Sequence, residues 1–555
     1  MLWLLMASLP TDTCPTHVSS LRATLPRMSR ASSRVFWILT VALLLLTRVP
    51  VAAKYLSIDN VSLAYALDKF DPRIHQPQPP GYPFFVLFAK IVNLIFRDPE
   101  TTFLVISVLI TGLSLPVLYA LASAMFDAWT ARAAVCLFLV NPVFWQTGLD
   151  GPLRVNLALF SLLTAYCAWR AWNGERAFVF WGALALGIGS GFRPDLLAFL
   201  GPVWLVSAFA GTRSVKTILA GGALLTSVVL VWVGGIAYAV GGVAELYQLI
   251  ASYLVEQSQP MSVVMGASAH GWRRQLSRLA VWNGLAILGW VWAYPLFLVS
   301  KDRIALLSRH FIFWTTWIVP GLIAQGLIHV DAPGHTLFSV PAFCLLGAYV
   351  LRTGLQRYSA ADIGLVVAVV VSVMLFLNFV PLPPAGSPGG VRDAFAVTTF
   401  ESSLEGTRWL DDVHGSSLRE IRDLTPPDRK VVIIAQDVVH QSNWFLNWRI
   451  ARYYLPDADI RTAAAQKKPV ETMEVRGSAF EIARTGSPVD ISVPEGCRIL
   501  WLVESGGPLH NALAAAGLAH GGPRVFYTDV EAGSAPFQVM DFRIVPAGVA
   551  PIGVQ

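Results

Sequence analysis

Long apolar runs alternate with short polar links over the first two thirds of the chain. A helix that crosses a bilayer needs about 20 consecutive, mostly apolar residues. On this basis the pattern predicts membrane-spanning helices at 35–53, 101–124, 131–147, 153–173, 177–191, 194–210, 216–240, 279–300, 310–328, 335–351 and 363–382. The pattern therefore predicts an α-helical polytopic membrane bundle of about eleven transmembrane helices.

The basic residues of the links recur on alternate sides of this bundle. With the N-terminus in the cytoplasm, the inner links hold Arg132, Arg170, Arg176, Arg213, Lys216, Lys301, Arg303, Arg309, Arg352 and Arg357. The short outer links 148–152 and 329–334 contain neither Lys nor Arg. Because Lys and Arg favour the cytoplasmic side, this orientation is preferred. An odd number of spans then places the C-terminal part of the chain outside the cell or in the periplasm.

The sequence divides into four parts. Residues 1–34 are expected to form a disordered cytoplasmic tail, and 35–382 form the membrane domain, with long outer loops at 54–100 and 241–278. Within the first loop, the apolar segment 81–96 is interrupted by Lys90 and predicts an amphipathic helix in the membrane interface. A Pro/Gly-rich linker, 383–395, precedes a segment of ordinary polar content, 396–555.

The C-terminal segment reads as a small α/β domain on the extracytoplasmic side. Strand patterns occupy 430–436, 498–504, 525–530 and 537–545, and helical patterns occupy 444–454 and 509–517. The segment has no glycine-rich phosphate loop and no nucleophile elbow. A structural or acceptor-docking role is its default interpretation.

Composition supports a protein of the plasma (inner) membrane. The chain is 55% hydrophobic and 14% charged, whereas soluble domains are about 25% charged. Its net charge of +6 is spread over short links and forms no patch, which argues against a nucleic-acid partner. Membrane lipid is the expected environment.

The first outer loop carries the leading catalytic candidate, Asp59, a few residues after the first span. A carboxylate there can take a proton from a hydroxyl or bind a metal; the alternative is a solvated acid or a helix cap. The proline-dense stretch 75–83 should form a stiff strut. In the next outer link, Asp150 lies on the same side; it could instead cap the following helix, with Pro152 in its first turn.

Arginines and histidines recur on the other outer segments. Arg193 could hold a phosphate or only pair with Asp195. The cluster His270, Arg273, Arg274 and Arg278 calls for an anion, either lipid headgroups or a polyprenyl phosphate. Metal-type residues in the last outer link have no metal-binding spacing, so a hydrogen-bond network is the preferred interpretation of His329, Asp331 and His335.

These features together resemble the GT-C glycosyltransferases, which include protein O-mannosyltransferases and lipid A aminoarabinose transferases. The resemblance covers about 35–380. It is carried by the acid after the first span, the long first loop with its interfacial helix, the acid of the next outer link, and the segments His75-Gln-Pro-Gln-Pro-Pro-Gly-Tyr-Pro, Gly191-Phe-Arg-Pro-Asp195 and Gly334-His-Thr-Leu. Asn60 replaces the second acid of the family's usual Asp-Glu pair, which leaves the acceptor class and a divalent metal at Asp59 and Asp150 open.

The resemblance implies a glycosyltransferase that takes its sugar from a polyprenyl-phosphate donor and gives it to a glycan, lipid or protein outside the cytoplasm. It implies direct inverting displacement with Asp59 as general base and Asp150 orienting the acceptor or a metal. The departing phosphate would be stabilised by Arg193, His270, Arg273, Arg274 or His335. Sugar and acceptor contacts are expected from His75, Tyr82 and Arg154.

Two other classes of function remain in competition. A transporter or flippase for lipid-linked sugars would need ionisable residues deep within the spans, of which the sequence has few. A non-catalytic subunit for envelope assembly would lack convergent acids. The clustering of polar groups on one side of the bundle favours surface chemistry.

Overall fold

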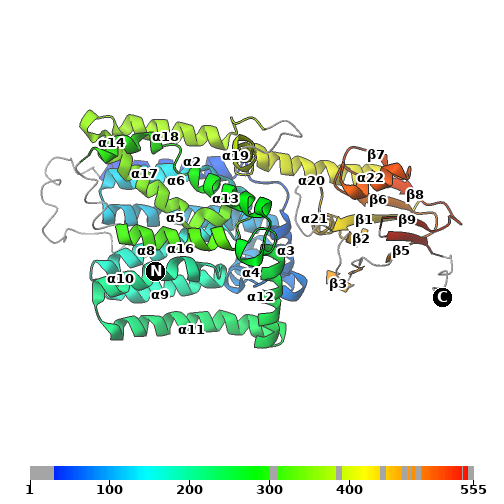
Figure 1. The fold of residues 1–555 in the computed structure, drawn as a ribbon, viewed down its shortest axis with the longest axis horizontal. Coiled ribbons are helices and arrows are strands. Elements are labelled where there is room, and N and C mark those ends of the chain that lie inside the picture. The colour runs from blue at the N-terminus through cyan, green and yellow to red at the C-terminus, as the bar shows by residue number, and fades with distance from the viewer. Residues whose placement is uncertain are drawn as a thin grey trace. The chain divides into compact units, whose positions relative to one another are not determined.

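The computed structural model describes residues 30–300, 311–382, 391–437, 445–464, 472–475, 478–481, 489–540 and 542–547 (Figure 1). The predicted N-terminal tail up to residue 29, most of the predicted linker and the inner link 301–310 lie outside these residues. The chain forms two compact units, each built from separate stretches of sequence. Unit 1 comprises Met1–Ala52, Leu104–Val231 and Glu256–Ser403, and unit 2 comprises Ala53–Phe103, Trp232–Val255 and Leu404–Gln555. Unit 2 thus groups most of the first predicted outer loop with the C-terminal segment.

Unit 1 is a bundle of mostly apolar helices whose long members run side by side (Figure 1). Its helices, of which α5 and α11 extend into unit 2, are α2 (Arg30–Arg48), α5 (Pro99–Met125), α6 (Ala128–Leu139), α7 (Pro142–Asp150), α8 (Val155–Trp172), α9 (Ala177–Phe192), α10 (Leu196–Thr212), α11 (Val215–Val240), α13 (Ala269–Gly284), α14 (Tyr294–Leu298), α16 (Phe311–Leu327), α17 (Val340–Leu355), α18 (Ala361–Phe376) and α19 (Val391–Phe400). Helix α8 packs against α9 and α10, and α17 packs against α6, α14 and α18.

The described helices differ in how well they match the length of a bilayer. By length and composition, α5 and α11 can each cross a membrane, and α6 with α7 pass the same test as a pair bent by 54°. Most predicted spans contain one main helix, but the ends of the helix differ from the ends of the apolar run. For instance, the 16 residues of α18 rise by about 24 Å and fall short of the predicted span 363–382. Hydropathy therefore located the helices better than it located their ends.

No continuous helix fills two of the predicted spans: 131–147 is broken between α6 and α7, and 279–300 is broken over a longer stretch. Helix α13 begins earlier, where the Ser268 side chain accepts a hydrogen bond from the backbone of Gly271, and it ends at Gly284. Turns, a 3₁₀ helix (Val291–Ala293) and the short α14 complete the segment. The prediction was wrong here because an apolar run reports burial and does not by itself report a continuous helix.

A break between α6 and α7 is held by a buried cation. Arg48, at the end of α2, is fully buried and donates a 2.6 Å hydrogen bond to the carbonyl of Leu139, where α6 ends. Its guanidinium also lies 4.8 Å from the ring centre of Trp145 on α7. A helix end leaves carbonyls without an intrahelical partner, and Arg48 satisfies one of them.

Unit 2 contains the helices of the outer loops and the C-terminal domain. The first loop forms α3 (Ile58–Asp68), a 3₁₀ helix η1 (Pro72–Ile74) and α4 (Pro83–Phe96), and the second contributes α12 (Val243–Ser258). Helix α4 confirms the helix predicted over 81–96. The C-terminal segment adds α20 (Leu404–Leu424), α21 (Trp448–Tyr454) and α22 (Pro508–Ala515).

The strands of the C-terminal domain confirm the predicted small α/β fold. A five-stranded sheet has the order β2-β1-β6-β8-β7, with β1 (Val431–Asp437), β2 (Asp459–Ala464) and β6 (Arg498–Leu502) parallel, and with β8 (Phe526–Asp529) and β7 (His520–Gly521) antiparallel. A second sheet has the order β5-β10-β9, from Val489–Val493, Phe542–Pro546 and Phe537–Val539. Strands β3 (Thr472–Val475) and β4 (Ser478–Glu481) form a separate hairpin.

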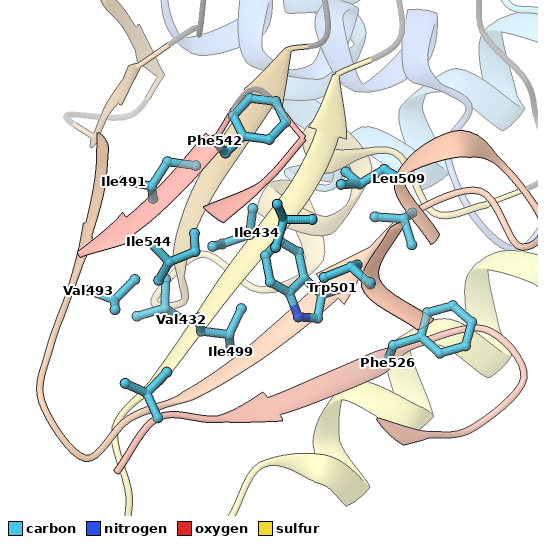
Figure 2. Close-up of a cluster of buried hydrophobic side chains, with 14 of the residues drawn as sticks. Val432, Ile434, Ile491, Val493, Ile499, Trp501, Leu509, Phe526, Phe542 and Ile544 are labelled. Atoms are coloured by element: carbon cyan, nitrogen blue, oxygen red, sulfur yellow. The ribbon is translucent and has the colours of Figure 1, made fainter. Parts of the chain in front are cut away.

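The core of this domain comes from alternate positions of its strands. Figure 2 shows Val432 and Ile434 of β1 with Ile499 and Trp501 of β6, all almost fully buried. Side chains from the second sheet and from α22 complete the cluster, among them Ile491, Val493, Leu509, Phe542 and Ile544. Since residues i and i+2 of a strand share a face, this pattern builds one apolar layer.

Hydrogen bonds join the first loop to the C-terminal segment within unit 2. The hydroxyl of Tyr454 accepts from the backbone of Leu56, and the carboxylate of Asp411 accepts from the backbones of Lys54 and Tyr55. The start of the loop is therefore fixed by side chains of α20 and α21.

Candidate functional site

Asp59 lies in the first turn of α3 and does not cap this helix, since Ser57 occupies the cap position. An acid in the first turn interacts favourably with the helix dipole. One carboxylate oxygen accepts a hydrogen bond from Nε2 of Gln78. Gln78 is buried and lies in the proline-dense stretch that was predicted to be a strut.

The other nominated residues of this loop also lie in unit 2. His75 follows η1, its Nδ1 lies 3.4 Å from the guanidinium of Arg449, and its ring meets that of Tyr253 edge to face. Tyr82 occupies the cap position of α4 in a left-handed conformation. In the same loop, Asp71 caps η1 and holds Arg73 with both carboxylate oxygens.

Asp150 and Arg154 lie in unit 1, between α7 and α8. Asp150 is the last residue of α7, and α8 begins at Val155 with Arg154 in the cap position. Pro152 lies outside both helices. The alternative that Asp150 caps the next helix is therefore wrong. Asp59 and Asp150 belong to different units, so their convergence on one site stays a prediction.

Arg193 ends α9 and Asp195 precedes α10, and the two side chains form an ion pair of 2.7 Å. The local pair that was one interpretation of these residues is thus present. Arg193 is nevertheless buried, with 9% of its surface exposed. Because desolvated charges interact more strongly than exposed ones, this guanidinium still acts on nearby groups, although Asp195 balances part of its charge.

Two histidines share this electrostatic environment. His329 and His335 face each other with ring centres 5.7 Å apart. Burial lowers the pKa of His335 well below its usual value, and the nearby charges of Arg193 and Arg154 lower it further. Burial also lowers the pKa of His329, against the opposing effect of Asp331 and with the help of the same two arginines. Unit 1 therefore brings Arg154, Arg193, His329 and His335 together as a cationic group with two neutral rings.

The link 329–335 is held by hydrogen bonds. The backbone of Asp331 donates to Nδ1 of His335 at 3.3 Å, and Gln325 donates to the carbonyl of His335 at 2.7 Å. This is the kind of network that the sequence favoured over a metal site. Gly334 is packed so closely that an added Cβ would lie 2.8 Å from Cβ of Arg154 and 2.9 Å from Cγ2 of Thr147.

Arg278 departs from the expectation for the basic cluster on α13. Its guanidinium pairs with Asp331 at 2.7 Å and with Glu401 at 2.6 Å. Its charge is thus balanced within unit 1, and it does not call for an outside anion. Arg274, one turn earlier, is exposed and lies within electrostatic reach of the same three groups.

His270 and Arg273 lie in the first turns of α13 and are exposed. Nothing in the described part of the chain ties them to the group around His335, so their donor-binding role stays a prediction. Among the described residues, no group of three or more His, Cys, Asp or Glu side chains is arranged to hold a metal ion.

Three residues of these networks were not nominated from the sequence as part of the site. Gln78 belongs to no recognisable motif. Its one signal in the sequence was a polar side chain within a stiff strut, which indicates that the side chain contacts another residue. His329 was considered only with its neighbours, and Glu401 lies 123 residues from Arg278, beyond any local pattern.

Comparison with known proteins adds evidence at the level of sequence and of fold. Residues 76–234 match the family described as dolichyl-phosphate-mannose-protein mannosyltransferase. A search of curated proteins finds no match to the sequence. The matched stretch begins in the proline-dense strut and ends within α11.

Solved structures share the fold over most of the chain. ArnT from Cupriavidus metallidurans in the apo state is similar with a TM-score of 0.57 and 14% identity, over 90% of this chain and 98% of that chain. The same protein bound to undecaprenyl phosphate gives a TM-score of 0.58 with the same identity and coverage. The chain thus shares the fold of ArnT over most of its length, and its residues 76–234 match a family of mannosyltransferases.

Proposed function

We propose that the protein transfers a sugar from a polyprenyl-phosphate donor to a lipid, polysaccharide or protein outside the cytoplasm, with inversion at the anomeric carbon. The observation that carries the proposal is the gathering of Arg154, Arg193, His329 and His335 in unit 1. Such a group fits the phosphate of a lipid-linked donor. The similar fold of ArnT, which has been solved with undecaprenyl phosphate, supports the same class of donor.

The chemistry is a single displacement. Asp59 takes the proton of the acceptor hydroxyl, whose oxygen attacks the anomeric carbon of the sugar. The bond from that carbon to the phosphate oxygen breaks, and the polyprenyl phosphate leaves with the electron pair. Because the phosphate leaves as an anion, no proton donor is required. Asp150 orients the acceptor on the face opposite the leaving group.

The cations act on the leaving phosphate. Arg193 stabilises the negative charge that grows on its oxygens, and the neutral ring of His335 can donate a hydrogen bond to them from Nε2. Arg274, Arg273 and His270 are further candidates for contacts with the phosphate. Arg154, nominated for the sugar, shares the electrostatic environment of Arg193 and is reassigned to the phosphate. His75 and Tyr82 remain assigned to the sugar or acceptor. Asp59 and Asp150 alone offer too few ligands for a well-defined metal site, so no step is routed through a metal.

The proposal places the protein in the inner or plasma membrane, with the C-terminal domain on the outer side beside the acceptor. The inner links with their Lys and Arg residues support this orientation. The C-terminal domain serves here as the partner of the first loop.

The test is donor cleavage by the purified full-length protein in lipid nanodiscs. Wild-type protein is supplied in turn with polyprenyl-phosphate mannose, glucose and aminoarabinose, each together with envelope lipid, polysaccharide and protein as acceptors, and the release of polyprenyl phosphate is measured. Asp59→Asn should lower turnover at least 100-fold, as is usual for loss of a general base. Asp68→Asn, an exposed acid at the end of the same helix, is the matched control and should keep full turnover.

Unchanged turnover in Asp59→Asn would remove this residue as the base. Movement of the intact donor across the nanodisc or a vesicle membrane without sugar release would instead indicate a flippase.

A further inference from the structure

We propose that Gln78 is the positioning residue of Asp59, which holds the carboxylate in the orientation needed to take a proton. This inference rests on the proposed function and adds a residue to its mechanism. It is carried by a buried amide that meets the carboxylate directly.

The contact is specific in its chemistry. Nε2 of Gln78 donates a hydrogen bond to Oδ1 of Asp59. An ionised carboxylate only accepts hydrogen bonds, so the nitrogen end of the amide must face it. The amide oxygen therefore points away, and it has no hydrogen-bond partner among the residues that the structure describes. This hydrogen bond restrains the rotation of the carboxylate, and with it the direction of the second oxygen.

The backbone presents Gln78 from a strut that is braced at both ends. Before it, Asp71 and Gln76 exchange two backbone hydrogen bonds, of 2.6 and 3.0 Å. After it, the backbone of Gly81 donates to the carbonyl of Gln78 at 2.9 Å. Gly81 has φ +106°, and a Cβ there would lie 2.9 Å from Cγ of Pro72.

This bracing explains the proline-dense sequence. Prolines at 77, 79 and 80 limit the conformations of the strut, so little freedom is left to be lost when Gln78 meets the carboxylate. A reactive group works best when the residues that hold it are themselves fixed by their surroundings. Gln78 meets this condition, since it is buried and only 8% exposed.

Other charged side chains also lie around α3, and they are the same in the wild type and in the variants compared below. Helix α3 packs against α4 and α21, whose charged side chains are Lys90, Arg449 and Arg452. Arg449 lies against His75, and Arg452 donates to the carbonyl of Ala458. On η1 and its cap, Arg73 and Asp71 neutralise each other. None of these groups is changed in the test below.

The experiment measures kcat/KM for donor cleavage against pH in the full-length protein in nanodiscs. Gln78→Leu removes the donor to the carboxylate, which favours the protonated acid, so the acidic limb of the profile should move up by about one pH unit. Gln78→Glu places a second acid beside Asp59 and should move the limb further. Gln76→Leu, a buried glutamine two residues away, is the matched control and should leave the limb unmoved.

The outcomes separate this inference from the proposed function. Absence of donor cleavage in the wild type, or full turnover in Asp59→Asn, would reject the function or the base. An active wild type and an inactive Asp59→Asn, combined with unshifted limbs in both Gln78 variants, would reject Gln78 alone. If the acidic limb moves as far in Gln76→Leu as in Gln78→Leu, the effect comes from a general loss of rigidity in the strut. That result would also reject the specific role of Gln78.

Discussion

Tyr454 donates a hydrogen bond of 2.7 Å from its hydroxyl to the carboxylate of Glu100. The same hydroxyl accepts one from the backbone of Leu56. One tyrosine of α21 therefore holds both ends of the segment that contains Asp59. The integrity of this proposed catalytic loop depends on the C-terminal segment, although the two are far apart in sequence.

Replacing Tyr454 with Phe should loosen this loop without touching Asp59. The change leaves a buried backbone N–H without its acceptor, which costs about 1–3 kcal/mol. We expect a lower melting temperature, faster limited proteolysis within 53–103 and a several-fold loss of turnover. Tyr358→Phe, at an exposed tyrosine, is the control and should behave as the wild type. An unchanged cleavage pattern in Tyr454→Phe would show that the loop is held by other contacts.

Replacing Gly334 with Ala should displace Arg154. The new methyl group would lie 2.8 and 2.9 Å from Cβ and Cδ of that side chain. If Arg154 binds the donor phosphate, the KM for donor should rise about tenfold, which corresponds to about 1.4 kcal/mol. Gly201→Ala is the control, because its methyl group would meet nothing within 4 Å. Equal KM values for the two variants would contradict the assignment of Arg154 to donor binding.

Replacing Arg278 with Met should destabilise unit 1. The change leaves Asp331 and Glu401 without their shared cation, and Glu401 is mostly buried, with 28% of its side chain exposed. Removal of one partner from a largely buried pair costs about 3 kcal/mol. Thermal unfolding of the single variant and of Arg278→Met/Glu401→Gln measures this. We expect partial recovery in the double variant; a double variant less stable than the single one would contradict the pairing.

His414 should make stability depend on pH. Burial lowers the pKa of this residue of α20 to about 4. Below a pH of about 6.5, His414 is protonated in the unfolded chain but stays neutral in the folded chain. The free energy of unfolding therefore falls as the pH drops from about 6.5 toward 4, by on the order of 3 kcal/mol. His414→Phe should remove this part of the acid sensitivity. An exposed histidine, His520, provides the control substitution; identical acid profiles for both variants would contradict the assignment.

Hydrophobic patterning predicted most of the fold. The apolar runs located the helices of unit 1, and alternation located β1, β6 and β8. It failed where a run is apolar but bent: 279–300 is broken, and 537–545 is not one strand but the pair β9 and β10, which turns around Met540 with φ +51°. Methionine is not a typical turn residue, so Met540 did not indicate a turn at this position. The helix α20 was missed because Gly415 and two serines interrupt its pattern.

Only those site residues that are conspicuous in their local sequence could be predicted. The acids and arginines of the outer links could be nominated because they stand out against apolar surroundings. Their partners could not: Gln78 meets Asp59 from 19 residues away, and Glu401 neutralises Arg278 from 123 residues away. Such pairings are decided by tertiary packing, which no window of sequence contains.

The bond between Leu56 and Tyr454 spans 398 residues. At a synthesis rate of about 5–20 residues per second, the ribosome needs roughly 20–80 s to make the second partner after the first. During that interval the loop that carries Asp59 lacks the hydrogen bonds that Tyr454 makes to Leu56 and Glu100. The loop that carries Asp59 is thus completed late in translation, and a chain that stops before α21 lacks the hydroxyl that bonds both Leu56 and Glu100.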